Sequence, residues 1–217
     1  MKEDFMTIYE GGVGEITVKK SRFIATICPA DTEAAALETI EVLKKKYWDA
    51  SHNCSAYIIG TEPPLMRCSD DGEPNKTAGK PMLDLLLAHE LVNIVVVVTR
   101  YFGGTLLGTG GLVKAYQSAV QEGLKYSKII RKELGIRAAV TTDYNLVGKL
   151  QYYISQEKLT ILFSEYTDLV LLEVLVPPSK YPAFVKKLAE LTNGTAILSE
   201  SGMIYFTTLE GKLLLFE

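Results

Sequence analysis

The sequence predicts an α+β protein of two domains, residues 1–131 and residues 132–217. In the first part, hydrophobic periodicity and turn residues predict the order β-β-α-β, a long loop, and then α-β-α. In the second part they predict β-α-β-β-α-β, which is the split βαβ or ferredoxin-like arrangement. The order of predicted strands and helices changes near residues 128–133, and this change marks the expected domain boundary.

A long loop interrupts the expected elements of the first domain. Two short strands and a helix, capped by Asp31 and ending in lysines, come before a third strand at 55–59. Residues 61–79 are expected to form a structureless loop, and loops of this length are often functional. Pro81 suits the first turn of a helix.

The strongest strand prediction is Asn93–Phe102, whose apolar run Ile94–Val98 is continuous rather than alternating. Such a run is typical of a central strand that is covered on at least one face. A glycine-rich turn, residues 103–111, and a helix over 112–124 follow it. The second domain is expected to have strands at 134–142, 159–165, 169–176 and 195–200, the last with a continuation at 204–208. Its helices are expected to be capped by Asp143 and Ser179.

Composition sets limits on the class of partner. The chain has 217 residues and a formal net charge of −3. Counted separately, residues 1–131 carry −1 and residues 132–217 carry −2. Proteins that bind nucleic acid without sequence readout usually have a basic excess, because phosphate neutralisation drives their affinity. Any nucleic-acid contact must therefore use a local patch, and no sequence-specific reading of DNA is expected.

The cysteines and the apolar segments indicate a cytoplasmic protein without a membrane partner. Cys28, Cys54 and Cys68 are too few, and odd in number, for a disulfide framework. The first ten residues are charged and lack the apolar core of a signal peptide. The longest apolar runs are too short to span a bilayer.

Three passages of the first domain together resemble the YigZ/Impact family, in its bacterial two-domain branch. They are His52–Tyr57, Ser69–Pro74 with Thr77–Pro81, and Val97–Gly108. The resemblance covers most of residues 15–126, and the second half is similar to the small second domain of the bacterial members. Cys68 departs from the family pattern, which often has an aromatic residue there, and Asn75-Lys76 replaces a more usual small pair.

The resemblance implies both a fold and a cellular role. It implies that the first domain folds like domain IV of elongation factor G, a two-layer α/β sandwich with a left-handed βαβ unit. It implies that the second domain folds like the ferredoxin-like domain V of that factor. The family's roles are related to translation or to nucleic-acid binding, so RNA or the ribosome is the expected partner.

The end of the predicted central strand offers a recognition site. An arginine beside two rings, Arg100 with Tyr101 and Phe102, is suited to contact phosphate and to stack on bases. Three lysines would add phosphate contacts: Lys76, Lys80 and Lys114. In the alternative interpretation the two rings pack internally, while Gly103 and Gly104 supply unusual backbone angles.

The glycine-rich turn before the next helix does not match a nucleotide-binding motif. Backbone N–H groups at a helix start can hold an anion. However, Thr109-Gly110 stands where a phosphate loop has its lysine and hydroxyl residue, and Val113 occupies the third glycine position of a dinucleotide fingerprint. A structural turn is therefore the favoured interpretation, and no cofactor is expected.

Two groups of reactive side chains lie nearby in the sequence. Asp70, Asp71 and Glu73 have carboxylate oxygens, which divalent cations take as ligands. Asp-Gly and Glu-Pro are also common turn sequences. A turn without a metal ion is therefore the favoured interpretation. His52 and Cys54 would share one face of a strand. They could form a nucleophile pair, although a buried cysteine is usually inert packing, so no catalytic residue is assigned.

Three functional hypotheses follow. The preferred one is a translation-associated binding protein that contacts RNA or the ribosome. The second is an enzyme in which residues 61–79 cover His52, Cys54 and Arg100. The third is a protein-interaction adaptor without nucleic acid. The surroundings of Arg100 distinguish them. A positive concave patch favours phosphate, and an apolar one favours a protein partner. An internal ion pair of Arg100, with its neighbours sealed from solvent, would remove the proposed recognition surface.

Overall fold

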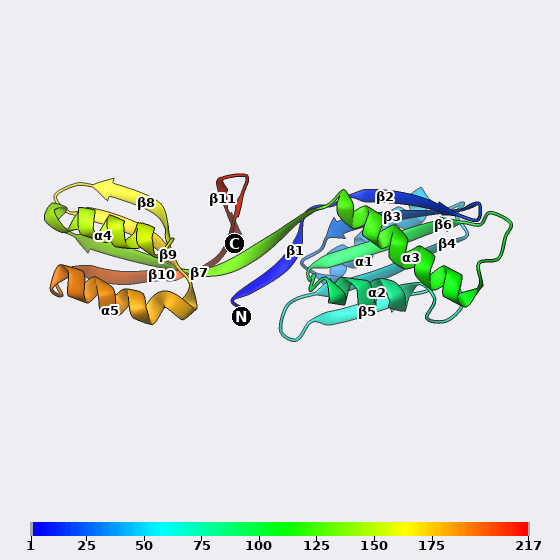
Figure 1. Ribbon diagram of the computed structural model, residues 1–217, viewed down its shortest axis with the longest axis horizontal. Helices are drawn as coiled ribbons and strands as arrows, with labels where there is room; N and C mark the ends of the chain where they lie inside the picture. Colours follow the sequence, from blue (N-terminus) through cyan, green and yellow to red (C-terminus); the bar gives the residue numbers. More distant parts are fainter. Residues whose placement is uncertain (1, 217) are drawn as a thin grey trace. The chain divides into compact units, whose positions relative to one another are not determined.

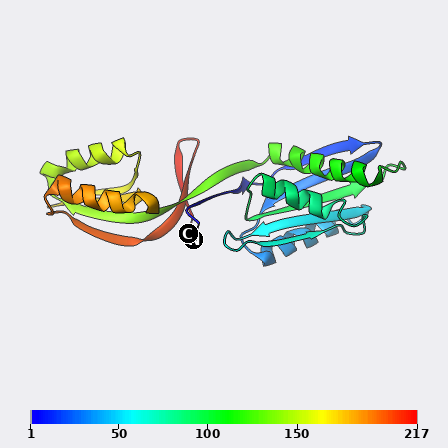
Figure 2. The ribbon, with the colours of Figure 1, turned by 60° about the horizontal axis from the view of Figure 1, so that its bottom comes forward.

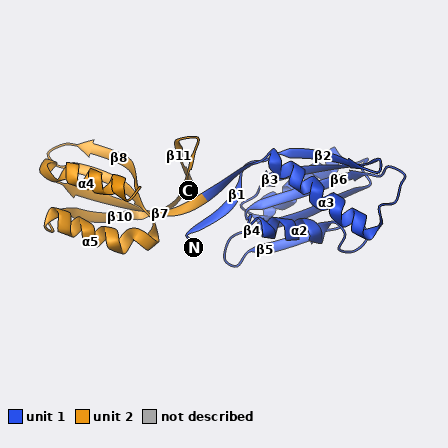
Figure 3. Cartoon of the chain, in the orientation of Figure 1, with its two compact units in different colours: residues 1–131 blue, residues 132–217 orange. Residues whose placement is uncertain are grey.

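The computed structural model describes residues 2–216 and forms two compact units, residues 1–131 and residues 132–217 (Figure 3). The predicted mixed α+β class is confirmed (Figure 1). The first unit contains β1 (Asp4–Glu10), β2 (Val13–Val18), β3 (Ser21–Pro29), α1 (Glu33–Lys46), β4 (His52–Ile59), β5 (Leu65–Ser69), α2 (Gly79–Ala88), β6 (Ile94–Tyr101) and α3 (Gly108–Lys125). After β7 (Lys128–Thr142), the second unit continues with α4 (Tyr144–Gln156), β8 (Thr160–Tyr166), β9 (Val170–Val176), a short 3-10 turn (Pro178–Lys180), α5 (Tyr181–Thr192), β10 (Ile197–Leu209) and β11 (Lys212–Phe216).

The sheet of the first unit places β6 at its centre. Its strand order is β2-β3-β6-β4-β5, and every neighbouring pair is antiparallel. Arg100 of β6 is therefore flanked by Phe23 of β3 and by His52 of β4. The helix α1 connects β3 to β4 across the intervening β6, so this part of the chain is a split βαβ unit.

Helices cover both faces of this sheet (Figure 2). One core packs α2 and α3 against Phe23, Val96 and Val98, and the other packs α1 against Val95 and Val97. The unit consequently has three layers, whereas the family resemblance implies a two-layer sandwich. The continuous apolar run of β6 explains the difference, because alternate residues of a strand point to opposite faces and both sets are buried here.

Several elements differ from the sequence prediction. The strand β5 lies inside the segment expected to be a structureless loop, and β1 was not predicted. Most side chains of β5 are exposed at the edge of the sheet, so this strand lacks the alternating apolar signal. The helix α1 is capped by Thr32 rather than Asp31, because the Thr32 hydroxyl accepts a hydrogen bond from Ala35 N at 3.2 Å.

The second unit has the predicted ferredoxin-like order. Its strands β10, β7, β9 and β8 lie side by side, with the first and third strands of the βαββαβ sequence at the centre. The helices α4 and α5 cover one face and enclose a core that includes Val140, Leu172 and Phe184. The last strand runs from Ile197 to Leu209 and includes the expected continuation at 204–208, and β11 pairs with it as an additional strand.

The chemistry of the described chain agrees with two further expectations. All three cysteines have free thiols. Among residues 2–216, no helix combines the length and the apolar character needed to cross a membrane.

Candidate binding site in the first unit

A cavity of about 430 Å³ opens where β6 ends and α3 begins. Its polar residues are His52, Glu73 and Arg100. Its apolar wall includes Phe102, Leu106 and Leu112, and the first turn of α3 contributes Gly108 and Thr109. Small-molecule pockets in proteins have volumes of roughly 300–1,000 Å³, so the cavity is large enough for a compact ligand or a protein side chain.

Arg100 is a buried partner in an ion pair. The residue is only 5% exposed, and its Nη1 donates to Glu73 Oε1 at 2.6 Å. The guanidinium carbon lies 5.4 Å from the centre of the Phe23 ring and 5.5 Å from that of Phe102. The expectation that Arg100 is an open cation for phosphate is therefore wrong, because the 61–79 segment brings a neutralising carboxylate onto it.

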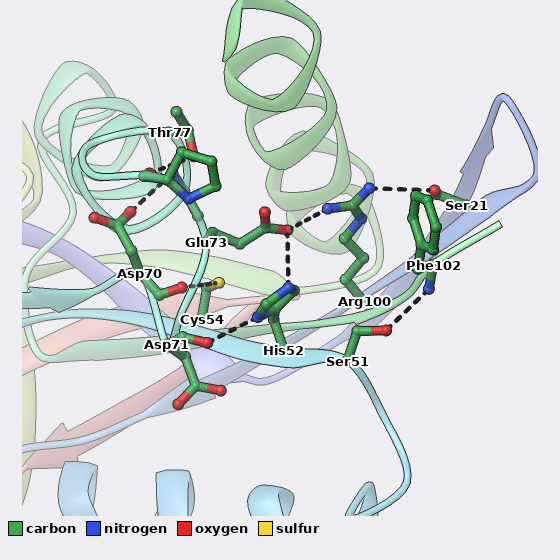
Figure 4. A network of polar contacts seen from close by, with 12 residues as sticks. Ser21, Ser51, His52, Cys54, Asp70, Asp71, Glu73, Thr77, Arg100 and Phe102 are labelled. Carbon is green, nitrogen blue, oxygen red and sulfur yellow. Dashed lines mark hydrogen bonds and ion pairs between the residues drawn. The ribbon is translucent and has the colours of Figure 1, made fainter. Parts of the chain in front are cut away.

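Glu73 is the centre of the polar network (Figure 4). Its Oε1 also accepts a hydrogen bond from the Tyr116 hydroxyl at 2.8 Å and lies 4.0 Å from His52 Nε2. Burial raises the pKa of Tyr116, and the nearby Cys54 and Glu73 raise it further, so the phenol stays protonated. No sequence motif marks Tyr116 as a site residue, and it lies within the helix expected over 112–124.

His52 is oriented by a hydrogen bond to the acidic turn and lines the cavity. His52 Nδ1 lies 2.8 Å from the carbonyl oxygen of Asp71, and a carbonyl can only accept, so Nδ1 carries the proton of that bond. In the neutral ring the other nitrogen, Nε2, is then a hydrogen-bond acceptor. In the protonated ring Nε2 is instead a donor that faces the Glu73 carboxylate, and in either state His52 lines the cavity.

Cys54 is a packing residue. It is fully buried, and its Sγ lies 3.0 Å from the Asp70 carbonyl oxygen and 3.3 Å from the Tyr116 hydroxyl. Burial raises the pKa of the thiol, which disfavours the thiolate needed for nucleophilic attack. The Cys54 nucleophile considered from the sequence is therefore wrong, and the enzyme hypothesis loses its proposed reactive group.

The three clustered carboxylates point to different partners. Asp70 accepts hydrogen bonds from the backbone N–H groups of Lys76, Ala78 and Gly79, at 2.8, 3.0 and 2.9 Å. Asp71 accepts from Asn53 N at 2.7 Å and from Lys44 Nζ at 3.0 Å. Glu73 is committed to Arg100, so the set does not converge on a common point. Within residues 2–216, no group of three or more acidic, histidine or cysteine side chains is arranged to hold a metal ion.

The turn interpretation of the acidic segment is confirmed. Asp71 and Gly72 have positive φ angles of 44° and 87°. Glu73 N donates to the Asp70 carbonyl oxygen at 2.9 Å and closes the turn. This local geometry directs the Glu73 side chain toward β6, and so it builds the ion pair with Arg100.

Sequence and structure comparisons identify relatives of the chain. A model of the Impact N-terminal domain matches residues 19–124, and a model of a domain of unknown function, DUF1949, matches residues 140–195. The IMPACT family member YvyE of Bacillus subtilis is 38% identical over 94% of this chain and 94% of its own length. The chain belongs to the IMPACT family.

Other members of the IMPACT family agree with this assignment. YigZ of Escherichia coli is 38% identical over 82% of this chain and 88% of its own length. A crystal structure of a hypothetical protein matches with a TM-score of 0.60 and 35% identity, over 91% of this chain and 97% of that chain. The predicted family is therefore confirmed over both units of the chain.

In this IMPACT family member, Tyr101 and Phe102 do not form one surface. The Tyr101 hydroxyl donates to Asp49 Oδ1 at 2.9 Å, and its side chain lies on the α1 face with Val95 and Val97. Phe102 follows the end of β6, lies beside Arg100 and is 49% exposed. The expectation of two adjacent stacking rings is wrong, because successive strand residues point to opposite faces.

The two glycines after Phe102 have the structural role considered from the sequence. A Cβ atom on Gly103 would lie 2.0 Å from the carbonyl carbon of Lys20, so no side chain fits there. Gly104 has a φ of 80°, which disfavours other residues. Gly103 N donates to Ser21 Oγ at 3.1 Å and fixes the chain against the β2–β3 turn.

The three lysines expected to assist Arg100 lie outside the cavity. Lys76, Lys80 and Lys114 are all exposed, and none belongs to its wall. Lys80 forms an ion pair with Asp84, one turn further along α2. The first unit therefore does not assemble the predicted cationic cluster around Arg100.

Proposed function

We propose that this protein is a translation-associated binding protein, and that the cavity of its first unit holds a protein component of the ribosome or its factors. Support for a role in translation comes from the family and from its resemblance to two domains of elongation factor G. Support for a protein partner comes from the chemistry of the cavity. The sequence favours RNA or the ribosome as the partner, and the neutral cavity favours a protein component over RNA.

The observation that carries this proposal is an apolar opening above a neutral ion pair. Phe102 is 49% exposed and Leu106 is 82% exposed, and both line the cavity. Beneath them the charge of Arg100 is balanced by Glu73. Phosphate binding requires uncompensated cations, whereas protein interfaces gain most of their affinity from apolar and aromatic groups seated in pockets.

Co-sedimentation with ribosomes at low and at moderate salt tests the proposal. We expect the protein to sediment with ribosomes, and to remain bound as the salt concentration is raised, because an apolar contact releases no counterions. Absence of co-sedimentation at both salt concentrations would overturn the proposal. A steep loss of binding with salt would instead assign the contact to RNA phosphate.

A matched pair of variants assigns the contact to the cavity. Leu106→Ser removes an exposed leucine from the cavity wall, and Leu37→Ser removes an exposed leucine from α1 on the other face of the sheet. We expect Leu106→Ser to weaken binding by about 5- to 30-fold, the effect of losing roughly 1–2 kcal/mol at an interface. The Leu37→Ser variant is expected to bind like the original protein. Equal binding by both variants would place the contact elsewhere on the protein.

A further inference from the structure

A basic and aromatic surface forms at one end of the first unit's sheet, beside the end of α1. The strand register puts the end of β6 next to the starts of β3 and β4. The loop of residues 47–51 brings the end of α1 to this place, and the β2–β3 turn reaches it at Lys19 and Lys20. Segments that are far apart in the sequence therefore meet there.

Trp48 is the most prominent side chain of this surface. It is 82% exposed and is the only tryptophan of the chain. Its two neighbours in the chain are held inward, because Tyr47 packs against the core under α1 and Asp49 accepts a hydrogen bond from the Tyr101 hydroxyl at 2.9 Å. The loop is thereby fixed to the sheet while the indole ring projects into solvent.

The lysines at this end of the sheet carry positive charge that the chain leaves unpaired. Lys19, Lys20 and Lys45 are exposed and form no ion pair within residues 2–216. Lys46 is also exposed, and its Nζ lies 4.9 Å from the centre of the Tyr47 ring. A single exposed ring is ordinary on a protein surface, but Trp48 directly follows a run of lysines.

The nearby acidic side chains do not cancel this charge. Glu15 and Asp71 already pair with cations of their own, at 2.6 and 3.0 Å. The carboxylates that remain are Asp49 and Glu41, which lies one turn before Lys45 on α1. Two carboxylates against four lysines leave an excess of two positive charges, in a unit whose formal net charge is −1. The charge of the unit is therefore segregated, and this end is a local basic patch.

Unpaired lysines beside an exposed ring suit a single-stranded nucleic acid. Lysines contact the phosphates, and an aromatic ring stacks on a base whatever its identity. An acidic peptide would use the charges and leave the indole without a role. A membrane surface would need a broad apolar face, and Trp48 is the one large apolar side chain that residues 47–51 expose, as far as the structure describes them.

We propose that this surface binds single-stranded RNA, with Trp48 stacked on a base and Lys19, Lys20, Lys45 and Lys46 close to phosphates. The base and the phosphate chain are common to RNA and DNA, so the choice of RNA rests on the proposed role in translation. The cavity is a separate site, because none of these residues belongs to its wall.

The intrinsic fluorescence of the full chain tests the stacking contact directly, because Trp48 is the only tryptophan. The probe is an oligouridylate of about 12 nucleotides, a length within the usual span of such sites. We expect saturable quenching at low salt, and weaker binding as the salt concentration rises, because phosphate contacts release counterions. N-acetyltryptophanamide in the same titration controls for light absorbed by the oligomer. Absence of quenching at low salt would overturn the proposal.

A matched pair of aromatic variants assigns the contact to Trp48. Fluorescence anisotropy of the same oligomer, labelled with fluorescein, measures the affinity of each variant. We expect Trp48→Ala to bind about 5- to 100-fold more weakly, the usual effect of losing one stacking ring. Tyr126 is a 66% exposed ring at the far end of α3, and Tyr126→Ala is expected to bind like the original protein. Equal losses in both variants would contradict the placement of the base.

A matched pair of lysine variants assigns the phosphate contacts. We expect the double variant Lys45→Gln with Lys46→Gln to reduce the slope of log affinity against log salt concentration by about one to two. The control replaces two exposed lysines of the second unit, Lys149→Gln with Lys186→Gln, and changes the net charge equally. The control is expected to keep the original slope. The same reduction in both would show a general effect of charge and overturn the patch.

Three further probes distinguish the sources of negative charge. They are polyglutamate, vesicles that contain an anionic lipid, and a thymidylate oligomer of the same length as the RNA. Binding of polyglutamate or of the vesicles as tightly as the RNA would overturn the nucleic-acid assignment. A more than tenfold preference for the thymidylate oligomer would overturn the choice of RNA.

These measurements fail independently of the ribosome assay. Co-sedimentation that depends on Leu106, without any binding of the oligomer, would overturn this inference and leave the proposed function intact. Binding of the oligomer through Trp48 without co-sedimentation would support the surface and remove the proposed role in translation.

Discussion

The buried pair of Glu73 and Arg100 determines the character of the site at the residue scale. Two opposite charges are removed from water at a separation of 2.6 Å, and each has further polar or aromatic neighbours. Glu73 neutralises the charge of Arg100, so the cavity wall that contains both residues has no net charge. It also fixes the acidic turn against the central strand, so its role is structural as well as chemical.

Removing one member of the pair is expected to be costly. Glu73→Ala leaves the Arg100 charge buried without its partner, and such changes typically cost about 3–5 kcal/mol. Urea denaturation measures the free energy of unfolding. Glu122→Ala breaks a pair with the exposed Lys125, and its expected cost is at most about 1 kcal/mol.

A double variant tests whether the cost comes from the unpaired charge. Replacing both partners, as in Glu73→Gln with Arg100→Met, removes the isolated charge. We expect the double variant to lose less stability than Glu73→Ala alone. If Glu73→Ala lost less than about 1 kcal/mol, the pair would not have the structural role assigned to it.

The sequence predicted which residues gather at the site better than it predicted what they do there. His52, Glu73, Arg100 and Phe102 all line the cavity. The alternation of side chains along a strand already places Tyr101 and Arg100 on opposite faces, which argues against a surface shared by these two residues. The capture of Arg100 by Glu73 depends on how a long segment folds back onto β6, and no local pattern records such a contact.

At the scale of single elements, Asp70 organises the start of α2. Burial alone would raise the pKa of Asp70, but the backbone N–H groups of Lys76, Gly79 and Ala78 outweigh it and lower the pKa below its ordinary value. A carboxyl group whose pKa is lower in the folded state stabilises the protein above its unfolded pKa, near about 3.9. That contribution disappears as the pH falls toward the folded pKa.

The lowered pKa of Asp70 in the folded state determines how the stability of an Asp70 variant should depend on pH. Asp70→Asn is expected to lower the free energy of unfolding by about 1 kcal/mol at neutral pH, because the anion is lost from a helix start. The difference from the original protein should shrink below about pH 4, where the original carboxyl group also becomes neutral. Urea denaturation near neutral and at acidic pH measures both values.

Asp84→Asn is the matched control on the same helix. Asp84 is half exposed and pairs with Lys80, so the expected loss is at most about 1 kcal/mol at either pH. A difference between Asp70→Asn and the original protein that widens under acidic conditions would contradict the assigned role of Asp70.

Elements that bury a regular apolar set were predicted, whereas the edge strands β5 and β11 were missed. The helices α3 and α4 and the strand β6 each bury a regular set of apolar residues, which is the signal that periodicity detects. The edge strands β5 and β11 lack that regular buried set. Their strand conformation comes from pairing with β4 and β10, which is tertiary information.

At the scale of the whole molecule, each unit has its own hydrophobic core. The two core clusters of the first unit lie entirely within residues 1–131, and that of the second unit lies entirely within residues 132–217. We propose that the units are domains in the thermodynamic sense, each able to open while the other stays folded.

Core variants test this proposal. Leu172 is fully buried in the second unit, and Leu172→Ala is expected to cost about 2–5 kcal/mol. Amide hydrogen exchange should show faster exchange in residues 132–217, with little change in residues 1–131. Val96→Ala, in a core of the first unit, should give the reverse pattern. A similar acceleration throughout the chain in either variant would show that the units open together.

The close approach of Gly103 to Lys20 has a consequence for the evolution of the cavity. The β2–β3 hairpin turns at Lys19 and Lys20, and its backbone occupies the space that a side chain at position 103 would need. Neither residue of this turn lines the cavity, yet the turn limits where the chain between β6 and α3 can run. We therefore expect ligand preference in related proteins to change with insertions in this hairpin, which is far from the cavity only in sequence, as well as with substitutions in the cavity wall.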